Sequence, residues 1–253
     1  MKWLPALVLL ASALHSSADW EITGSEDFLK NLPGGACVRR VELGGSGASA
    51  QLTAVIFLAK SYSVRVLDSR SPGRTKLDSS LAEAGCVAGV NGSYFQADFR
   101  PVGLMVADGR EIQPIAKAKL LAGVFAVRGT RLEIVRSSKF TKSSDLKQAV
   151  QCGPMLVEGG QPTAGLNSER PARRTVVATD GRGRWALIYL TSVTLADAAR
   201  ILTVPGALGD WRPSTALNLD GGSSSGLWAA TSPEPISLPE FGHVRNYIGI
   251  APR

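Results

Sequence analysis

The chain contains little histidine and little cysteine, and both shortages limit the chemistry open to it. Of its 253 residues, two are histidine and three are cysteine. His15 lies in an N-terminal segment that we expect to be removed, which leaves His243 as the one candidate base for a catalytic triad. A histidine-rich metal site is therefore excluded. Cys37, Cys86 and Cys152 lack metal-ligand spacing, and three thiols cannot all pair within one chain, so any disulfide is left open.

Long hydrophobic runs are scarce as well. The most apolar stretch, Leu4–Leu14, is shorter than the roughly 20 residues needed to span a bilayer, and no later segment reaches that length. It follows Lys2 and precedes small residues at positions 16–18, which is the pattern of a signal peptide. We therefore expect residues 1–18 to be a signal peptide and the mature protein to be periplasmic or secreted. We expect no stable membrane insertion after cleavage.

Negative charge is outweighed by positive charge, but only moderately. The formal net charge is +7, and removal of Lys2 with the signal peptide lowers it to +6. The densest basic cluster is Arg170, Arg173 and Arg174. No run of Lys and Arg alternates with aromatic residues, so we expect no nucleic-acid partner. A diffuse positive charge favours an anionic substrate over a cationic one.

Periodicity predicts one domain with many strands and a few helices. A weak helical pattern at Phe28, Leu29 and Leu32 marks residues 19–35 as an N-terminal extension, and residues 36–253 form the domain. Residues 76–84 and a segment capped by Thr194 are the clearest helices. Strands are expected over 38–43, 51–59, 62–67, 87–90, 103–106, 123–127, 132–135, 174–179, 185–191, 216–219 and 246–250. Strands and helices do not alternate regularly, so we predict an α+β fold with mixed or mostly antiparallel sheets.

The most informative stretch is ALNLDGGSSSG, residues 216–226. The apolar run 216–219 predicts a buried strand, so Asp220 is expected at the strand's end, where a sheet opens into a cleft. Gly221 and Gly222 permit a close approach of ligand to the backbone. The serines at 223–225 offer hydroxyl and backbone N–H donors to an anion. The alternative interpretation is a tight turn in which Asp220 only caps the backbone.

Several segments, taken in order, carry a resemblance to a known family. They are VNGSYF at 90–95, CGPML at 152–156, RTVVATD at 174–180, LNLDGGSS at 217–224 and RNYIGI at 245–250. Together they resemble the phosphodiester glycosidase family over roughly residues 85–252. That family includes bacterial exported proteins and an enzyme that removes N-acetylglucosamine from a sugar–phosphodiester. Ser93, Ala178 and Ser223 stand where the family commonly has glycine, which bears on the substrate more than on the fold.

The resemblance implies a hydrolase that cleaves a sugar-1-phosphodiester, and the residues fit that chemistry. A glycosidase usually needs a second carboxyl group to protonate a poor leaving group. A phosphomonoester has a last pKa of about 6 and departs with little proton donation, so one carboxylate with cationic donors suffices. Asp220 is the candidate base or nucleophile, and Arg174 is the catalytic cation for the phosphate. The candidate substrate-binding residues are Asn91, Gly92, Gly221, Gly222, Ser223, Ser224, Arg245 and Asn246.

Other interpretations of the same residues stay open. Arg174 is equally typical of a structural ion pair, and Asn91 of a bond to the turn after its strand. Tyr94 is expected in the core. Glu158 and Asp180 lie in glycine-rich turns, where solvated side chains are the simpler expectation, although either is a candidate second acid.

Two further function classes compete with a glycosidase. GSSSG at 222–226 matches the G-x-S-x-G pattern, so a serine hydrolase using Ser224 and His243 is one alternative. Cys152 as a nucleophile lacks an evident base. A non-catalytic module that binds envelope glycans is the other. No cofactor is evident, and no ligand set for a divalent cation is visible, which leaves dependence on such a cation open.

Overall fold

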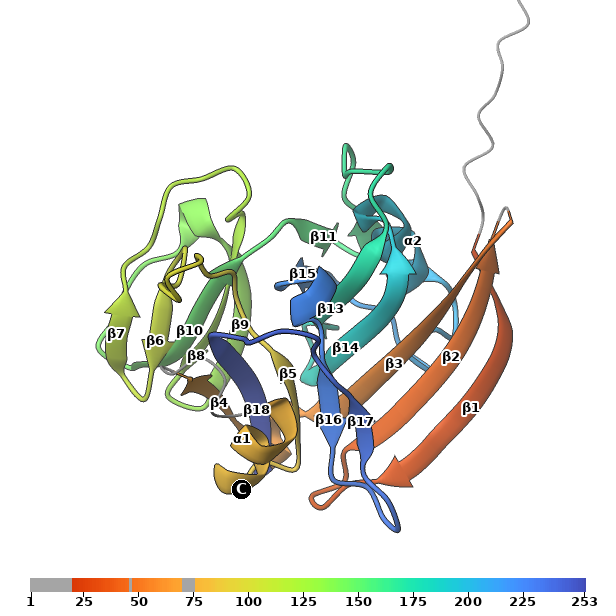
Figure 1. The fold of residues 1–253 in the computed structure, drawn as a ribbon, viewed down its shortest axis with the longest axis horizontal. Coiled ribbons are helices and arrows are strands. Elements are labelled where there is room, and N and C mark those ends of the chain that lie inside the picture. Colours follow the sequence, from red (N-terminus) through yellow and green to blue (C-terminus); the bar gives the residue numbers. More distant parts are fainter. Residues whose placement is uncertain (1–19, 46, 70–75) are drawn as a thin grey trace, which may run out of the picture.

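A computed structural model describes residues 20–45, 47–69 and 76–253 of the chain. The expected signal peptide at 1–18 lies outside the described residues. The described part forms three sheets, one of eight strands and two of five (Figure 1). Strand neighbours along each sheet run antiparallel. With two α-helices packed on these sheets, the prediction of an α+β fold with mostly antiparallel sheets is confirmed.

The eight-stranded sheet has the order β1-β2-β3-β14-β13-β15-β11-β12. Its strands are β1 (Glu21–Asn31), β2 (Cys37–Gly45), β3 (Ala48–Leu58), β11 (Met155–Glu158), β12 (Gln161–Pro162), β13 (Ala172–Thr179), β14 (Arg184–Val193) and β15 (Thr215–Asn218). The strands predicted at 174–179 and 185–191 are present and form the β13–β14 hairpin across Asp180 and Gly181, with Thr179 opposite Trp185. Residues far apart in the chain are joined here, since β3 pairs with β14.

The other two sheets have five strands each. One has the order β7-β6-β10-β8-β9 and the other β17-β16-β5-β18-β4. The first contains β6 (Met105–Ala107), β7 (Arg110–Gln113), β8 (Gly123–Arg128), β9 (Arg131–Arg136) and β10 (Leu146–Cys152). The second contains β4 (Tyr62–Asp68), β5 (Ala88–Asn91), β16 (Leu227–Ala229), β17 (Ile236–Leu238) and β18 (Asn246–Pro252).

Both predicted helices are present. They are α1 (Leu77–Glu83) and α2 (Leu195–Thr203), and the short 3-10 turns are η1 (Ala59–Ser61), η2 (Ser137–Lys139) and η3 (Gly222–Ser224). The Thr194 hydroxyl accepts a hydrogen bond from the Asp197 N–H at 3.0 Å, as expected of an N-cap. None of the helices in the described residues is long and apolar enough to cross a bilayer.

The main hydrophobic core lies between the sheets. Phe57 and Leu217 of the eight-stranded sheet share it with Phe125 of the first five-stranded sheet and Ile248 of the second. The opposite face of the eight-stranded sheet is covered by α2 through Ile201 and neighbouring apolar residues. Helix α1 covers the outer face of the second five-stranded sheet in the same way. Each helix therefore closes a sheet face that would otherwise be open.

The helical expectation for residues 19–35 is wrong. Residues 21–31 form β1, which pairs antiparallel with β2 from Glu21 opposite Gly44 to Asn31 opposite Cys37. The free edge of β2 supplies hydrogen-bond partners that a weak local helical preference cannot match, because propensity yields to tertiary pairing. The indole N–H of Trp20, just before β1, donates to the Asp197 carboxylate at 3.1 Å and ties this end of the chain to α2.

Candidate functional site

Strand ends from two of the sheets meet at one place. β5 ends at Asn91 and its antiparallel partner β18 begins at Asn246, so both asparagines lie at the same sheet edge. In the eight-stranded sheet β15 ends at Asn218, two residues before Asp220 and opposite Val176 of β13. The Asp220 N–H donates to the Gly92 carbonyl at 2.9 Å and so joins the two sheets. The site is built at this junction.

Asp220 is the carboxylate at the centre of the junction. Burial raises its pKa from 3.8 to about 6, although hydrogen bonds from the Ser224 side chain and the Gly221 N–H act in the opposite direction. The Gly221 N–H lies 2.9 Å from Asp220 Oδ1. No ion pair of Asp220 is found among the described residues, so no cation lowers its pKa. A carboxylate with a pKa near neutrality can accept or release a proton under physiological conditions.

The loop after Asp220 is held by an arginine that the sequence analysis assigned no role. Arg173 donates to the carbonyls of Gly222 at 2.9 Å and Ser223 at 3.1 Å. Gly222 has a φ of +63°, in the left-handed region that favours glycine. Ser224 is buried and its hydroxyl hydrogen-bonds Asp220, whereas Ser223 is exposed. Of the predicted loop residues, Gly221 and Ser224 therefore hydrogen-bond the Asp220 carboxylate.

Asn91 positions the main chain of the site. Its side-chain Nδ2 donates to the Asp220 carbonyl at 2.8 Å. Its Oδ1 accepts from the Thr175 hydroxyl at 2.6 Å and from the Gly226 N–H at 3.1 Å. The side chain is fully buried. Both ends of the amide are thus engaged inside the protein, and the geometry assigns Asn91 to positioning rather than to direct contact with a ligand.

Asn246 performs a similar task for the turn after β5. Its Oδ1 accepts from the Ser93 N–H at 2.9 Å, and its main-chain carbonyl accepts from the Gly92 N–H at 2.8 Å. A Cβ on Gly92 would lie 1.8 Å from Asn246 Oδ1, so no larger residue fits there. The buried Asn246 and Gly92 therefore fix the turn that accepts the Asp220 N–H.

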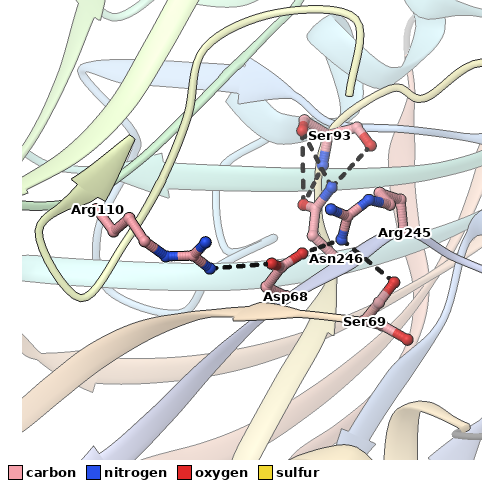
Figure 2. A network of polar contacts seen from close by, with 6 residues as sticks. All are labelled: Asp68, Ser69, Ser93, Arg110, Arg245 and Asn246. Atoms are coloured by element: carbon pink, nitrogen blue, oxygen red, sulfur yellow. Dashed lines mark hydrogen bonds and ion pairs between the residues drawn. The ribbon is translucent and has the colours of Figure 1, made fainter. Parts of the chain in front are cut away.

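Arg245 pairs with an internal carboxylate. Figure 2 shows its guanidinium directed at Asp68, with a further bond from Nη1 to the Ser69 carbonyl at 3.2 Å. The side chains of Arg245 and Asp68 are 8% and 10% exposed. Arg110 approaches the same carboxylate at 3.4 Å from the exposed side. The guanidinium of Arg245, a candidate substrate-binding residue, is therefore already engaged in a buried ion pair.

Arg174 lies beside the glycine loop. Its Nε and Nη2 donate to the carbonyls of Val193 at 3.0 Å and Arg170 at 2.7 Å. A Cβ on Gly221 would be 3.7 Å from Arg174 Nη1. That nitrogen therefore lies close to the residue that follows Asp220. Burial lowers the pKa of the guanidinium, and the Tyr94 side chain opposes this. Two hydrogen bonds to backbone carbonyls thus hold the half-buried guanidinium beside the site.

Tyr94 packs against the main hydrophobic core, as expected from the sequence, and its hydroxyl also lies near the site. Its hydroxyl donates to the Gly153 carbonyl and accepts from Asn218 Nδ2 at 3.1 Å. Burial raises its pKa, and the neighbouring Cys152 and Asp220 add to the shift, so the hydroxyl keeps its proton. Burial also raises the pKa of the Cys152 thiol to about 12. A thiol of that acidity is a poor nucleophile at neutral pH, which argues against catalysis by Cys152.

The other candidate acids and bases lie away from this junction or are already bonded. Glu158 accepts from Arg136 Nε at 2.8 Å. Asp180 accepts from the N–H groups of Arg182 and Arg184 in its turn. His243 is exposed and lines a separate cavity. The Ser224 side chain hydrogen-bonds the Asp220 carboxylate. In a serine hydrolase the nucleophilic serine would hydrogen-bond a histidine, so this arrangement differs.

No group of three or more His, Cys, Asp or Glu side chains that could hold a metal ion occurs in the described part of the chain. Asp220 is the one carboxylate at the junction described above, and its neighbours Asn218, Tyr94 and Asn91 supply amide and hydroxyl groups. The chemistry of the site is therefore carried by one carboxylate, one half-buried arginine and neutral hydrogen-bonding groups.

Comparison with known proteins places these residues in a family. The family model "Phosphodiester glycosidase" matches residues 84–251. Over 78 residues the chain is 33% identical to the uncharacterized protein YigE of Escherichia coli (strain K12), a match that spans 28% of this chain and 31% of that protein. The chain thus covers about a third of that curated relative.

Two solved structures share the fold. One is a hypothetical protein from Synechocystis, with a TM-score of 0.62, 15% identity, and coverage of 86% of this chain and 62% of that chain. The other is the catalytic domain of zebrafish N-acetylglucosamine-1-phosphodiester alpha-N-acetylglucosaminidase, auto-inhibited by its pro-peptide. It has a TM-score of 0.61, 16% identity, and coverage of 93% of this chain and 88% of that chain. At these identities the likeness concerns the fold.

Proposed function

Because the chain belongs to the phosphodiester glycosidase family, we propose that it hydrolyses the bond between the anomeric carbon of a sugar and the phosphate of a phosphodiester. Family membership supports a glycosidase-type hydrolase. The sugar, N-acetylglucosamine or one like it, and a location outside the cytoplasm are parts of this proposal. The substrate's phosphodiester is anionic, in keeping with the basic net charge.

The observation that carries the proposal is the environment of the Asp220 carboxylate. Among the described residues placed at the junction, Asp220 is the one carboxylate, and its pKa is about 6. Such a site cannot easily protonate an alkoxide leaving group, which is what an ordinary glycoside requires. A phosphomonoester needs little or no proton to leave, since its last pKa is about 6. The site therefore suits a phosphate leaving group better than an alcohol.

The residues then have separate tasks in the reaction. The ionised Asp220 either takes a proton from the attacking water or attacks the anomeric carbon itself. In both cases the bond from the anomeric carbon to the phosphate oxygen breaks, and its electron pair leaves with the phosphate. If Asp220 attacks, water then hydrolyses the ester between Asp220 and the sugar, which releases the sugar and restores the carboxylate. Arg174 stabilises the charge that develops on that phosphate through its Nη1 edge. Asn91, Asn246 and Arg173 hold the main chain on which Asp220 and its loop depend.

The test is a turnover screen of the purified protein with and without a chelator. The panel contains N-acetylglucosamine-1-phosphodiesters, nucleotide sugars and p-nitrophenyl glycosides of the same sugars. We expect release of sugar and phosphomonoester from phosphodiesters and no reaction with the p-nitrophenyl glycosides. Retention of configuration at the anomeric carbon identifies Asp220 as the nucleophile, and inversion identifies it as the base. Binding without turnover, unchanged by Asp220→Asn, would instead indicate a glycan-binding module.

A further inference from the structure

Positive charge is concentrated in the first five-stranded sheet and its connections. Residues 105–152 contain nine Lys and Arg against four Asp and Glu, a net charge of +5. The mature chain expected from the sequence carries +6 in total, so most of the excess lies in this one part of the fold. A net charge gathered in one place creates a local field that attracts an anionic partner.

Within this part, the connection between β7 and β8 and the turn η2 border a hollow of about 630 Å³. In Figure 1 that connection rises beyond the ends of the strands of its sheet. The charged residues that line the hollow are Lys117, Lys119 and Arg136, and none of its lining residues is acidic. Arg136 already pairs with Glu158, so the two lysines carry the attraction for an anion.

The same connection exposes two large apolar side chains. Ile115 is 43% exposed and Leu120 is 54% exposed. They flank the two lysines in the sequence IAKAKL at 115–120, and Ile115 lines the hollow together with Lys117 and Lys119. A lysine can lay its aliphatic stem along apolar material while its ammonium group stays in water. The connection therefore offers both charge and apolar surface to a partner.

The connection is held in shape from inside the protein. The side-chain amide of the buried Gln151 donates to the carbonyls of Ala116 at 2.8 Å and Leu121 at 3.2 Å. Its oxygen accepts from the Ala116 N–H at 2.9 Å. The Ser137 hydroxyl donates to the Leu121 carbonyl at 2.6 Å and so ties the connection to η2. Residues 117–120 are thus presented between two fixed points, which lowers the ordering cost of binding.

We propose that residues 115–120 and η2 form a docking surface for an anionic lipid bilayer. Lys117 and Lys119 approach the phosphate headgroups, while Ile115 and Leu120 enter the boundary with the acyl chains. A protein partner fits this composition less well, because lysine is depleted from the cores of protein–protein interfaces. A soluble polyanion would engage the lysines and leave both apolar side chains in water. Docking of this kind is reversible and takes no segment across the bilayer.

The docking surface lies next to the candidate site. A Cβ on Gly153 would be 2.2 Å from the Leu120 carbonyl, so the connection packs directly on that glycine. The Gly153 carbonyl in turn accepts from Asn218 Nδ2 at 2.9 Å, two residues before Asp220. Docking therefore brings the candidate site close to the bilayer. The docking itself does not depend on the proposed function.

The test is cosedimentation of the purified protein with two kinds of vesicle. One contains phosphatidylglycerol and phosphatidylcholine in equal amounts, and the other contains phosphatidylcholine alone. We expect binding to the mixed vesicles and at least about tenfold weaker binding to the neutral ones. Lys117→Gln combined with Lys119→Gln should weaken binding to the mixed vesicles by about 30-fold, or about fivefold for each cation. Ile115→Ser combined with Leu120→Ser should weaken it by about tenfold or more, the scale of burying one apolar side chain.

The matched control combines Lys60→Gln with Arg182→Gln, which removes the same charge from exposed positions outside residues 105–152. It should change binding by less than about twofold, and circular dichroism checks the folding of each variant. No binding of the wild type to the mixed vesicles, or unchanged binding of the lysine variant, overturns the proposal. An equal loss in the control assigns binding to net charge alone and also overturns it. Unchanged binding of the Ile115→Ser, Leu120→Ser variant indicates attraction to any polyanion, which overturns docking on a bilayer.

Discussion

The side-chain amide of Asn91 donates a 2.8 Å hydrogen bond to the main-chain carbonyl of Asp220 and thereby ties β5 to the end of β15. The same side chain accepts from Thr175 on β13 and from Gly226 after the serine loop. One buried amide therefore joins four segments that are far apart in the sequence. The amide of Asn91 therefore helps to fix the main chain at Asp220, the carboxylate to which we propose a catalytic role.

Asn91→Ala should be strongly destabilising. The substitution leaves the Asp220 carbonyl, the Thr175 hydroxyl and the Gly226 N–H without their buried partner, and each such group costs about 1–3 kcal/mol. We expect a loss of at least about 2 kcal/mol in the free energy of unfolding, measured by urea denaturation. Gln161→Ala on the exposed strand β12 is the control and should change it by less than about 0.5 kcal/mol. A similar small change for Asn91→Ala would show that the amide does not hold the site.

Asp220 should make the protein less stable as the pH rises. Its pKa is about 6 in the folded protein and 3.8 without the burial that causes the shift, so folding favours the protonated form. The resulting stabilisation is fully present below about pH 4 and is lost as the pH rises through 6. Asp220→Asn should therefore raise the free energy of unfolding by up to about 3 kcal/mol at pH 7, with no gain at pH 3.5. Denaturation curves at both pH values measure this, and a gain that does not depend on pH would contradict the shifted pKa.

Arg174→Lys should impair turnover although it preserves the charge. A lysine cannot donate to the carbonyls of Val193 and Arg170 and still present a second nitrogen to the phosphate. We expect kcat/KM for a sugar-1-phosphodiester to fall by about 100-fold or more, the usual effect of removing one donor to developing charge. Arg182→Lys in the exposed turn after β13 is the matched control. Unchanged kcat/KM in a well-folded Arg174→Lys protein would assign the arginine a purely structural role.

Arg245→Met should lower stability and leave KM unchanged. It leaves the Asp68 carboxylate, which is 10% exposed, without its nearest cation, and breaking such a buried pair costs about 3–5 kcal/mol. Because the penalty comes from a buried carboxylate that has lost its nearest cation, adding Asp68→Leu should recover much of it. Unfolding measurements on the two single variants and the double variant form the cycle. A raised KM at unchanged stability would instead support the substrate contact that the sequence motif predicted.

Local signals predicted most of the fold. The β13–β14 hairpin has turn residues at its tip, and α2 has a capping threonine, so both can be predicted from neighbouring residues alone. Residues 21–31 could not be predicted in this way, because their strand exists through pairing with β2. The order of strands in the eight-stranded sheet, which places β3 beside β14, likewise depends on contacts between distant segments.

The sequence supplied candidate site residues, and their roles in a reaction stay predictions. Motif spacing identified Asp220, Arg174 and Asn91, since each lies at the end or start of a strand. It could not show that the Asn91 amide faces inward, because the direction of a buried side chain is set by the packing of several segments. Tyr94 was expected in the core and does pack against it, but the position of its hydroxyl could not be predicted. Its hydroxyl is near the site only because Asn218 and Gly153 come together there.

The most direct test of the central claim is the rate at which Asp220→Asn releases sugar from an N-acetylglucosamine-1-phosphodiester. Asparagine keeps the size of the side chain and an oxygen that can accept the Gly221 N–H, but it can act neither as a base nor as an efficient nucleophile. We predict that kcat falls by about 1,000-fold or more, while circular dichroism matches the wild type. Turnover by Asp220→Asn at the wild-type rate would contradict the account.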